Sequence, residues 1–153
     1  MRLWEHRSRT MDVFDRFLNR DPEARARFER AAAAVDRELA GNLELCAMFD
    51  QTHQAAVFEN AEFARQAAVL RASAPAAFAF LAGVYEGLPA TESAMERRGP
   101  ANTIRPEDLA LIERWEGDVR EAQRQLRAAL TSPPPSLWST LLGRLRGGRL
   151  TGR

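Results

Sequence analysis

The side chains that most often carry acid–base or metal chemistry are scarce in this sequence. His6 and His53 are the two histidines among 153 residues, and histidine is the commonest metal ligand and the usual proton carrier near neutral pH. The best metal-like spacing is Asp50-x-x-His53, followed by Glu59-x-x-Glu62. A di-iron helical bundle needs a Glu-x-x-His pair on each of two helices. Because a second pair is missing, we expect no metal and no cofactor.

Nucleophilic and phosphate-binding chemistry is equally poorly represented. Cys46 is the single cysteine, so the chain can form no internal disulfide. It shares an apolar stripe with Leu39 and Phe49, where a thiol is expected to be buried, protonated and unreactive. The glycine-rich patterns GxGxxG and GxxxxGK, which bind phosphates, are both absent from the sequence. We therefore predict no catalytic residue.

The segment "ERRGPANTIRPE" is a candidate anion-binding site. Arg97, Arg98 and Arg105 precede Pro106, which is expected to begin a helix. Guanidinium groups beside the positive N-terminal end of a helix favour phosphate or carboxylate. The competing interpretation is that these arginines are solvated or pair with neighbouring glutamates.

The C-terminal segment 132–153 carries four arginines and no acidic residue. Pro133–Pro135 prevent the preceding helix from continuing, and Ser136 can cap a new one. A short helix there places apolar side chains on one face and arginines toward the other; these residues are Leu137, Trp138, Leu141, Leu142, Arg144, Leu145 and Arg146. Such a helix is typical of a contact with a membrane surface or a protein groove. Docking onto the same chain, or disorder, are the alternatives.

The elements that must position these residues are predicted to be helices. The chain has 27 alanines and 17 leucines but only two isoleucines and six valines, a composition that favours helix over strand. Two long helices are predicted, over 22–52 and 106–130. Each carries an apolar stripe at alternating spacings of three and four residues, as in a coiled coil: Phe28, Ala32, Val35, Leu39, Asn42, Cys46 and Phe49, then Ile112, Trp115, Val119, Ala122, Leu126 and Ala129.

Shorter elements fill the rest of the chain. Helices are predicted over about 11–19, 60–72 and 76–88, with Asn60 as the cap of the second. The third is apolar almost all round, which predicts the most buried helix. Residues 89–105, with two prolines and a glycine, are expected to form a long connection without helix. Asn42, a polar residue within the first stripe, is expected to be buried and bonded to a neighbouring backbone.

These elements predict an all-α fold: an elongated antiparallel helical bundle with two long heptad-patterned helices and a short C-terminal amphipathic helix. One domain is expected from the length. The predicted organisation is a basic N-terminal arm over 1–10, a bundle domain over 11–131 and a Pro-broken basic tail over 132–153. Whether translation starts at Met1 or Met11 decides whether the arm exists.

The net charge of +1 is unevenly distributed. Residues 1–9 contribute +2 and residues 133–153 contribute +4, so that residues 10–132 carry −5. An acidic body with few clustered arginines argues against nucleic acid as a partner. No stretch is long and apolar enough for a spanning helix, and residues 1–20 lack a secretory h-region. All 22 basic residues are arginine, which suggests a GC-rich bacterial source. Because the chain has a single cysteine and residues 1–20 lack a secretory h-region, the expected location is the cytoplasm, either free or at a membrane surface.

The sequence therefore favours a non-enzymatic interaction or scaffold module. The bundle is expected to self-associate or to bind a protein partner through its apolar stripes. The C-terminal tail is expected to dock on a membrane surface or in a groove of a partner. The alternative is a small-ligand or metal-binding bundle, or an enzyme. Its site would lie near Asp50, His53, Glu59, Glu62 and Tyr85, or at the segment that contains Arg97, Arg98 and Arg105.

Overall fold

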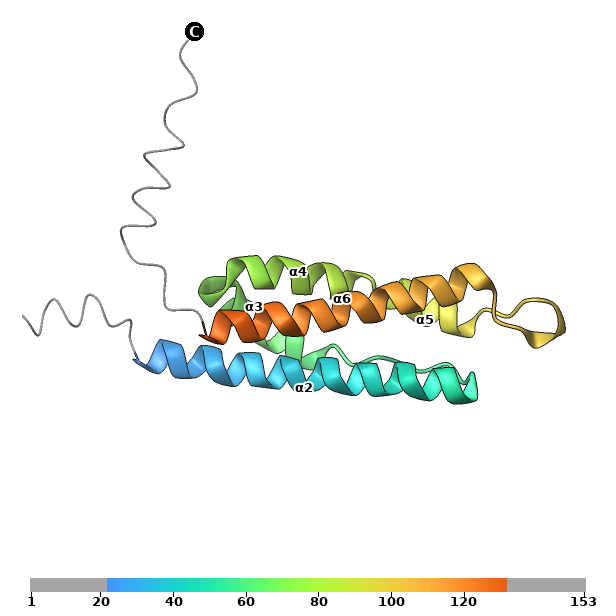
Figure 1. Ribbon diagram of the computed structural model, residues 1–153. Helices are drawn as coiled ribbons and strands as arrows, with labels where there is room; N and C mark the ends of the chain where they lie inside the picture. Colours follow the sequence, from blue (N-terminus) through green and yellow to red (C-terminus); the bar gives the residue numbers. More distant parts are fainter. Residues whose placement is uncertain (1–21, 132–153) are drawn as a thin grey trace, which may run out of the picture. The chain divides into compact units, whose positions relative to one another are not determined.

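The structure is a computed structural model and describes residues 22–131. Its regular structure is entirely helical, with no strand among the described residues (Figure 1). This confirms the all-α class that the composition predicts. The predicted arm over 1–10, the predicted helix over 11–19 and the predicted tail helix after Ser136 lie outside the described residues.

The first long helix, α2, spans Pro22–Thr52, in agreement with the predicted range. Proline fits the first turn because the first N–H groups of a helix have no intrahelical acceptor, so a missing donor costs nothing there. The seven residues of the predicted stripe are all buried, from Phe28 to Phe49. Ala31 and Glu38 are buried beside them.

The second long helix, α6, spans Pro106–Thr131. Glu107 and Asp108 occupy its first turn, where negative charge is favourable. Five residues of its predicted stripe are buried and the sixth, Ala129, is partly buried: Ile112, Trp115, Val119, Ala122 and Leu126. Glu116 and Arg120, one turn apart on α6, form an ion pair with a distance of 2.6 Å between Oε2 and Nη2.

Polar contacts join the two long helices. Gln123 Nε2 donates a hydrogen bond to the main-chain oxygen of Asp36 at 3.2 Å, and Arg127 Nη2 lies 3.0 Å from Asp36 Oδ2. Arg25 of the first turns of α2 donates to the main-chain oxygen of Leu130. Because the start of α2 meets the end of α6, the two helices run in opposite directions, side by side (Figure 1).

Two shorter helices follow α2: α3 (Ala61–Ser73) and α4 (Pro75–Glu86). Ala74 separates them because its non-helical backbone, with φ of −144° and ψ of 67°, breaks the helical run. The prediction that α4 is the most buried helix is wrong. Its Ala76, Ala79 and Gly83 are exposed on one face, which costs little because these side chains present almost no apolar surface to water.

The expectation of a helix-free connection over 89–105 is also wrong. A helix, α5, spans Leu88–Glu96, and a short 3₁₀ turn covers Pro100–Asn102. Pro89 does not end the helical structure. It lies in the first turn of α5, where proline is tolerated. The buried Leu88, Ala94 and Met95 tie α5 to the core.

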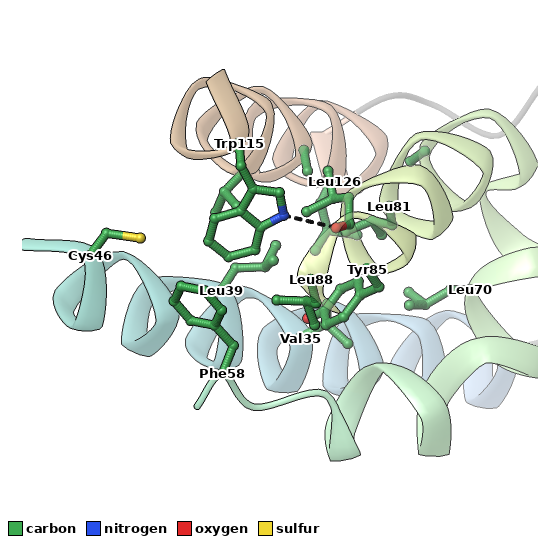
Figure 2. Packing of buried hydrophobic residues seen from close by; sticks show 14 of the residues in the cluster. Val35, Leu39, Cys46, Phe58, Leu70, Leu81, Tyr85, Leu88, Trp115 and Leu126 are labelled. Carbon is green, nitrogen blue, oxygen red and sulfur yellow. Dashed lines mark hydrogen bonds between the residues drawn. The ribbon is translucent and has the colours of Figure 1, made fainter. Parts of the chain in front are cut away.

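The core gathers apolar side chains from α2, α3, α4, α5 and α6. Trp115 is central to it, since its indole Nε1 donates to the main-chain oxygen of Val84 at 2.9 Å (Figure 2). The ring of Phe58, from the segment between α2 and α3, lies 4.5 Å from the Trp115 ring. No helix within residues 22–131 has both the length and the apolar character required to cross a membrane.

Candidate functional site

The buried carboxylate of Glu38 is the centre of a polar cluster that joins α2, α3 and α4. It accepts the backbone N–H groups of Glu62 at 2.6 Å and Phe63 at 3.0 Å. It also accepts the hydroxyl of Tyr85 at 2.7 Å. The two backbone donors are the first free N–H groups of α3, so a side chain of α2 caps α3. Asn60 precedes α3 but makes no side-chain cap, which corrects the predicted role of this residue.

Tyr85 is held by aromatic contacts as well as by Glu38. Its ring stacks on that of Phe63, with centroids 4.1 Å apart and an angle of 5° between planes. Phe63 also stacks on Phe78 at 5.8 Å, and the Arg71 guanidinium lies 4.7 Å from the centroid of Phe78. Burial, and secondarily the bond to Glu38, raises the pKa of the Tyr85 hydroxyl far above its ordinary value. The hydroxyl is therefore a fixed hydrogen-bond donor.

Asn42, one turn after Glu38, holds the segment between α2 and α3. Its Nδ2 donates to the main-chain oxygen of Glu59 and its Oδ1 accepts the Glu59 N–H, both at 2.8 Å. The neighbouring Phe58 N–H donates to Glu92 Oε1 at 2.8 Å. The prediction that Asn42 is buried and bonded to a neighbouring backbone is confirmed. This irregular segment thus obtains from side chains the hydrogen bonds that a helix would supply.

The structure does not gather the predicted acid–histidine group into one site. His53 is exposed, has a φ of 54° and directs its ring toward Phe49 at 6.1 Å. Glu62 pairs with Arg65, whereas the backbone of Glu59 is bonded to Asn42. Among the described residues, no group of three or more histidine, cysteine or acidic side chains is placed to hold a metal ion.

The predicted arginine segment surrounds a carboxylate of the chain itself. Arg97 Nε lies 2.9 Å from Asp108 Oδ1, and Arg105 Nε lies 2.9 Å from Asp108 Oδ2. The Asp108 side chain is 2% exposed. Its hydrogen bond with Arg97, followed by that with Arg105, holds the pKa of this carboxyl below its ordinary value. The two guanidinium groups therefore have an internal anion at the N-terminal end of α6.

Arg98 lies apart from this arrangement and bonds to main-chain oxygens. Its Nη2 is 2.5 Å from the oxygen of His53, and its Nη1 is 2.9 Å from the oxygen of Arg97. Ala101 and Asn102 adopt positive φ angles of 55° and 60° as the chain turns toward α6. Arg98 thus connects the end of α2 with the segment that follows α5.

Cys46 is fully buried in the core, as the sequence predicts. Burial, with smaller contributions from Glu116 and Asp50, raises the pKa of the thiol to about 12. A thiol that stays protonated is a poor nucleophile. Its place in the core is therefore that of a small apolar side chain.

Large apolar side chains also reach the surface. Val57 is 81% exposed, Met48 is 57% exposed and Leu109 is 37% exposed. Met48 lies in the last turns of α2, and Val57 lies in the segment between α2 and α3. The predicted membrane- or partner-contacting side chains from Leu137 to Arg146 lie outside the described residues.

The roles of two buried carboxylates, Glu38 and Asp108, were not anticipated from the sequence. Glu38 precedes Asn42 by one turn, so an acidic and an amide residue sit together beside an apolar stripe, and this pairing was the available signal. Asp108 occupies the third position of a helix that begins with proline. An acidic side chain at this position commonly stabilises the positive N-terminal end of the helix. The hydrogen-bond partners of the two carboxylates could not be predicted from the sequence.

Comparisons of this chain with protein-family models, with curated proteins and with solved structures find no match.

Proposed function

We propose that this protein is a non-enzymatic interaction or scaffold module. In this proposal the helices form an elongated antiparallel bundle whose two long members, α2 and α6, pack through heptad stripes. The C-terminal segment 132–153 contacts either a protein partner or a membrane surface. The proposed location is the cytoplasm, free or at a membrane surface.

The observation that carries this proposal is the exposure of Met48, in the last turns of α2, and of Val57, in the segment between α2 and α3. Contiguous exposed apolar surface typically marks a contact site. The leucines and tryptophan of the C-terminal segment supply further apolar contact area with adjacent positive charge. By contrast, the carboxylates of Glu38 and Asp108 are engaged in hydrogen bonds that cap α3 or bind the chain's own arginines. These carboxylates have structural roles.

The membrane and protein alternatives are separated by co-sedimentation with vesicles. The full-length chain is mixed with anionic or zwitterionic liposomes and compared with a Leu141→Glu/Leu142→Glu variant. Leu109→Glu is the matched control, because it adds a charge at an exposed leucine of α6. A membrane contact predicts that anionic vesicles pellet the wild-type chain and the control but not the double variant, and that salt releases it. Absence of pelleting leaves the protein-partner form of the proposal, which sedimentation velocity tests by size.

A further inference from the structure

Residues 53–60, which we call the strap, join α2 to α3 and contain no helix-breaking residue. The sequence has neither glycine nor proline between Gly41 and Pro75, and the strap includes alanine, glutamine and glutamate, which are good helix formers. His53 marks the end of α2 with a positive φ of 54°, a conformation that is unfavourable for a residue with a Cβ atom. The irregular path of the strap is therefore not required by its own residues.

Side chains from outside the strap hold its backbone in this path: Asn42, Glu92 and Arg98. Asn42 bonds the backbone N–H and oxygen of Glu59, both at 2.8 Å. Glu92 accepts the N–H of Phe58 at 2.8 Å, and Arg98 donates to the oxygen of His53 at 2.5 Å. The interruption between α2 and α3 is thus imposed by tertiary contacts.

One buried side chain of the strap anchors it to the core. Phe58 is 5% exposed, and its ring centroid lies 4.5 Å from that of Trp115 (Figure 2). By contrast, Ala55 and Val57 are exposed. The strap is therefore fixed by a single apolar anchor and a few hydrogen bonds, in contrast to the helices on either side of it.

The apolar stripe of α2 continues through the strap into α3 without a change of register. Ala56, Phe63 and Leu70 follow Phe49 at steps of seven residues, and all three belong to the core or pack against it. The intervening positions of the three-and-four spacing are His53, Asn60 and Ala67. Two helices joined by a reversal need no common register, whereas a continuous helix of the coiled-coil type does.

We propose that the strap is a hinge for exchange between two copies of this chain. In the exchanged state the strap is helical, α2 and α3 form one helix over 22–73, and α2 packs against the α3–α6 part of a second copy. Strained hinge segments favour such exchange. This inference goes beyond the proposed function, because the described helices, and not the C-terminal segment, form the contact.

The geometry of the helices selects a second copy as the partner. In the closed chain α3 runs back along α2, because Glu38 bonds Glu62 whereas Asn42, one turn later, bonds Glu59. A continuous helix over 22–73 is about 78 Å long and directs α3 away from α2. The surface that α2 then loses is present, with the same side chains, on another copy of the chain. Reciprocal exchange closes a two-fold dimer.

The test is sedimentation velocity of full-length chains that are incubated at high concentration in urea near the unfolding midpoint and then returned to buffer. The wild-type chain is expected to yield a dimer. Asn42→Leu should strengthen dimerisation at least about tenfold, because it removes two strap bonds and places an apolar side chain on the continuous stripe. Gln123→Leu is the matched control. It removes a buried amide that bonds the Asp36 backbone away from the strap, so it should dimerise like the wild type.

Proline in the strap tests the exchange directly. Ala55→Pro leaves the bonds of Phe58 and Glu59 in place but prevents a continuous helix, so it should abolish the dimer in both the wild-type and the Asn42→Leu backgrounds. Ala55→Ser, at the same exposed position, should dimerise like the wild type. Val57→Pro is a second variant of the same kind, and circular dichroism verifies that each variant remains helical. Wild-type and Asn42→Leu chains that both stay monomeric, or a dimer that forms with proline in the strap, would overturn the proposal.

The vesicle experiment separates this inference from the proposed function. Because Ala55→Pro does not alter the C-terminal segment, it should pellet with anionic liposomes to the same extent as the wild type. A chain that pellets but never exchanges rejects the hinge and supports the membrane contact. A dimer that Leu141→Glu/Leu142→Glu abolishes and Ala55→Pro does not also rejects the hinge, and assigns the contact to the C-terminal segment.

Discussion

The hydroxyl of Tyr85 donates a hydrogen bond of 2.7 Å to a carboxylate oxygen of Glu38, a residue 47 positions earlier in the chain. The same carboxylate caps α3 through the N–H groups of Glu62 and Phe63. One buried side chain of α2 thus determines where α3 begins and how α4 packs against it. Three donors replace the hydration that this side chain loses on burial.

Replacing Glu38 by alanine is expected to lower the free energy of unfolding by about 3 kcal/mol, because it leaves two backbone N–H groups and a hydroxyl without their acceptor. Tyr85→Phe should cost about 1 kcal/mol, since it removes one donor and leaves Glu38 its other two. Urea unfolding followed by circular dichroism measures both changes. Glu113→Ala, at an exposed position of α6, is the control and should change stability by less than about 0.5 kcal/mol.

The double variant Glu38→Ala/Tyr85→Phe provides a stricter test of the shared hydrogen bond. Because both substitutions remove the same bond, their combined cost should be smaller than the sum of the single costs. Strict additivity of the two costs would contradict the assigned contact between Glu38 and Tyr85.

The two glycines near the end of α4 are expected to respond oppositely to alanine. A Cβ at Gly87 would meet the Trp115 Cδ1 atom at 3.2 Å and the Val84 oxygen at 3.3 Å, whereas one at Gly83 meets nothing within 4 Å. Gly87→Ala should therefore destabilise by about 1–2 kcal/mol through displacement of the indole. Gly83→Ala should stabilise by about 0.5–1 kcal/mol, because alanine loses less backbone entropy in a helix. Thermal unfolding compares them, and equal effects would contradict the close approach at Gly87.

Most of the helices could be predicted from the sequence, because each has a local signal: apolar residues at helical spacing or a proline at its start. The stripes of α2 and α6 repeat at helical spacing, and Pro22, Pro75 and Pro106 each begin a helix. α5 was missed because Pro89 and the glycine at 99 were interpreted as marks of an irregular connection. Proline in a first turn is equally compatible with a helix. Only the contacts of Leu88 and Met95 with the core decide between a helix and an irregular connection.

The polar contacts were far less predictable, because they join residues distant in sequence. Nothing local indicates that Glu38 serves α3 in place of Asn60, or that Asp108 engages Arg97 across eleven positions. Asn42 was anticipated because a single amide in an apolar stripe must be bonded when buried. Its partner, the Glu59 backbone, depends on the path of the segment between α2 and α3.

The free energy of unfolding is expected to decrease at acidic pH because of Asp108. Its pKa is lowered in the folded chain by Arg97 and Arg105, so the ionised form stabilises the fold above the ordinary pKa of about 4. This contribution is lost as the pH falls through the lower, folded-state pKa. Asp108→Asn should therefore destabilise more at pH 7 than at pH 3, as measured by urea unfolding. Asp118→Asn, at an exposed position of the same helix, is the control and should change stability by less than about 0.5 kcal/mol at pH 7. A cost at Asp108 that is equal at both pH values would contradict the ion pairs.

The Cys46 thiol is expected to resist modification as long as the chain is folded. With a pKa of about 12, only about one thiol in ten thousand is ionised at pH 8, and the thiolate is the reactive form. Reaction with a chromogenic disulfide at pH 8 should be slow in buffer and accelerate at the urea concentration that unfolds the helices, since unfolding removes the desolvation that raises the pKa. The Glu38→Ala variant should bring this acceleration to lower urea, because it destabilises the same cooperative unit. Immediate reaction of the native chain would place the thiol at the surface and contradict its position beside Leu39 and Phe49 in the core.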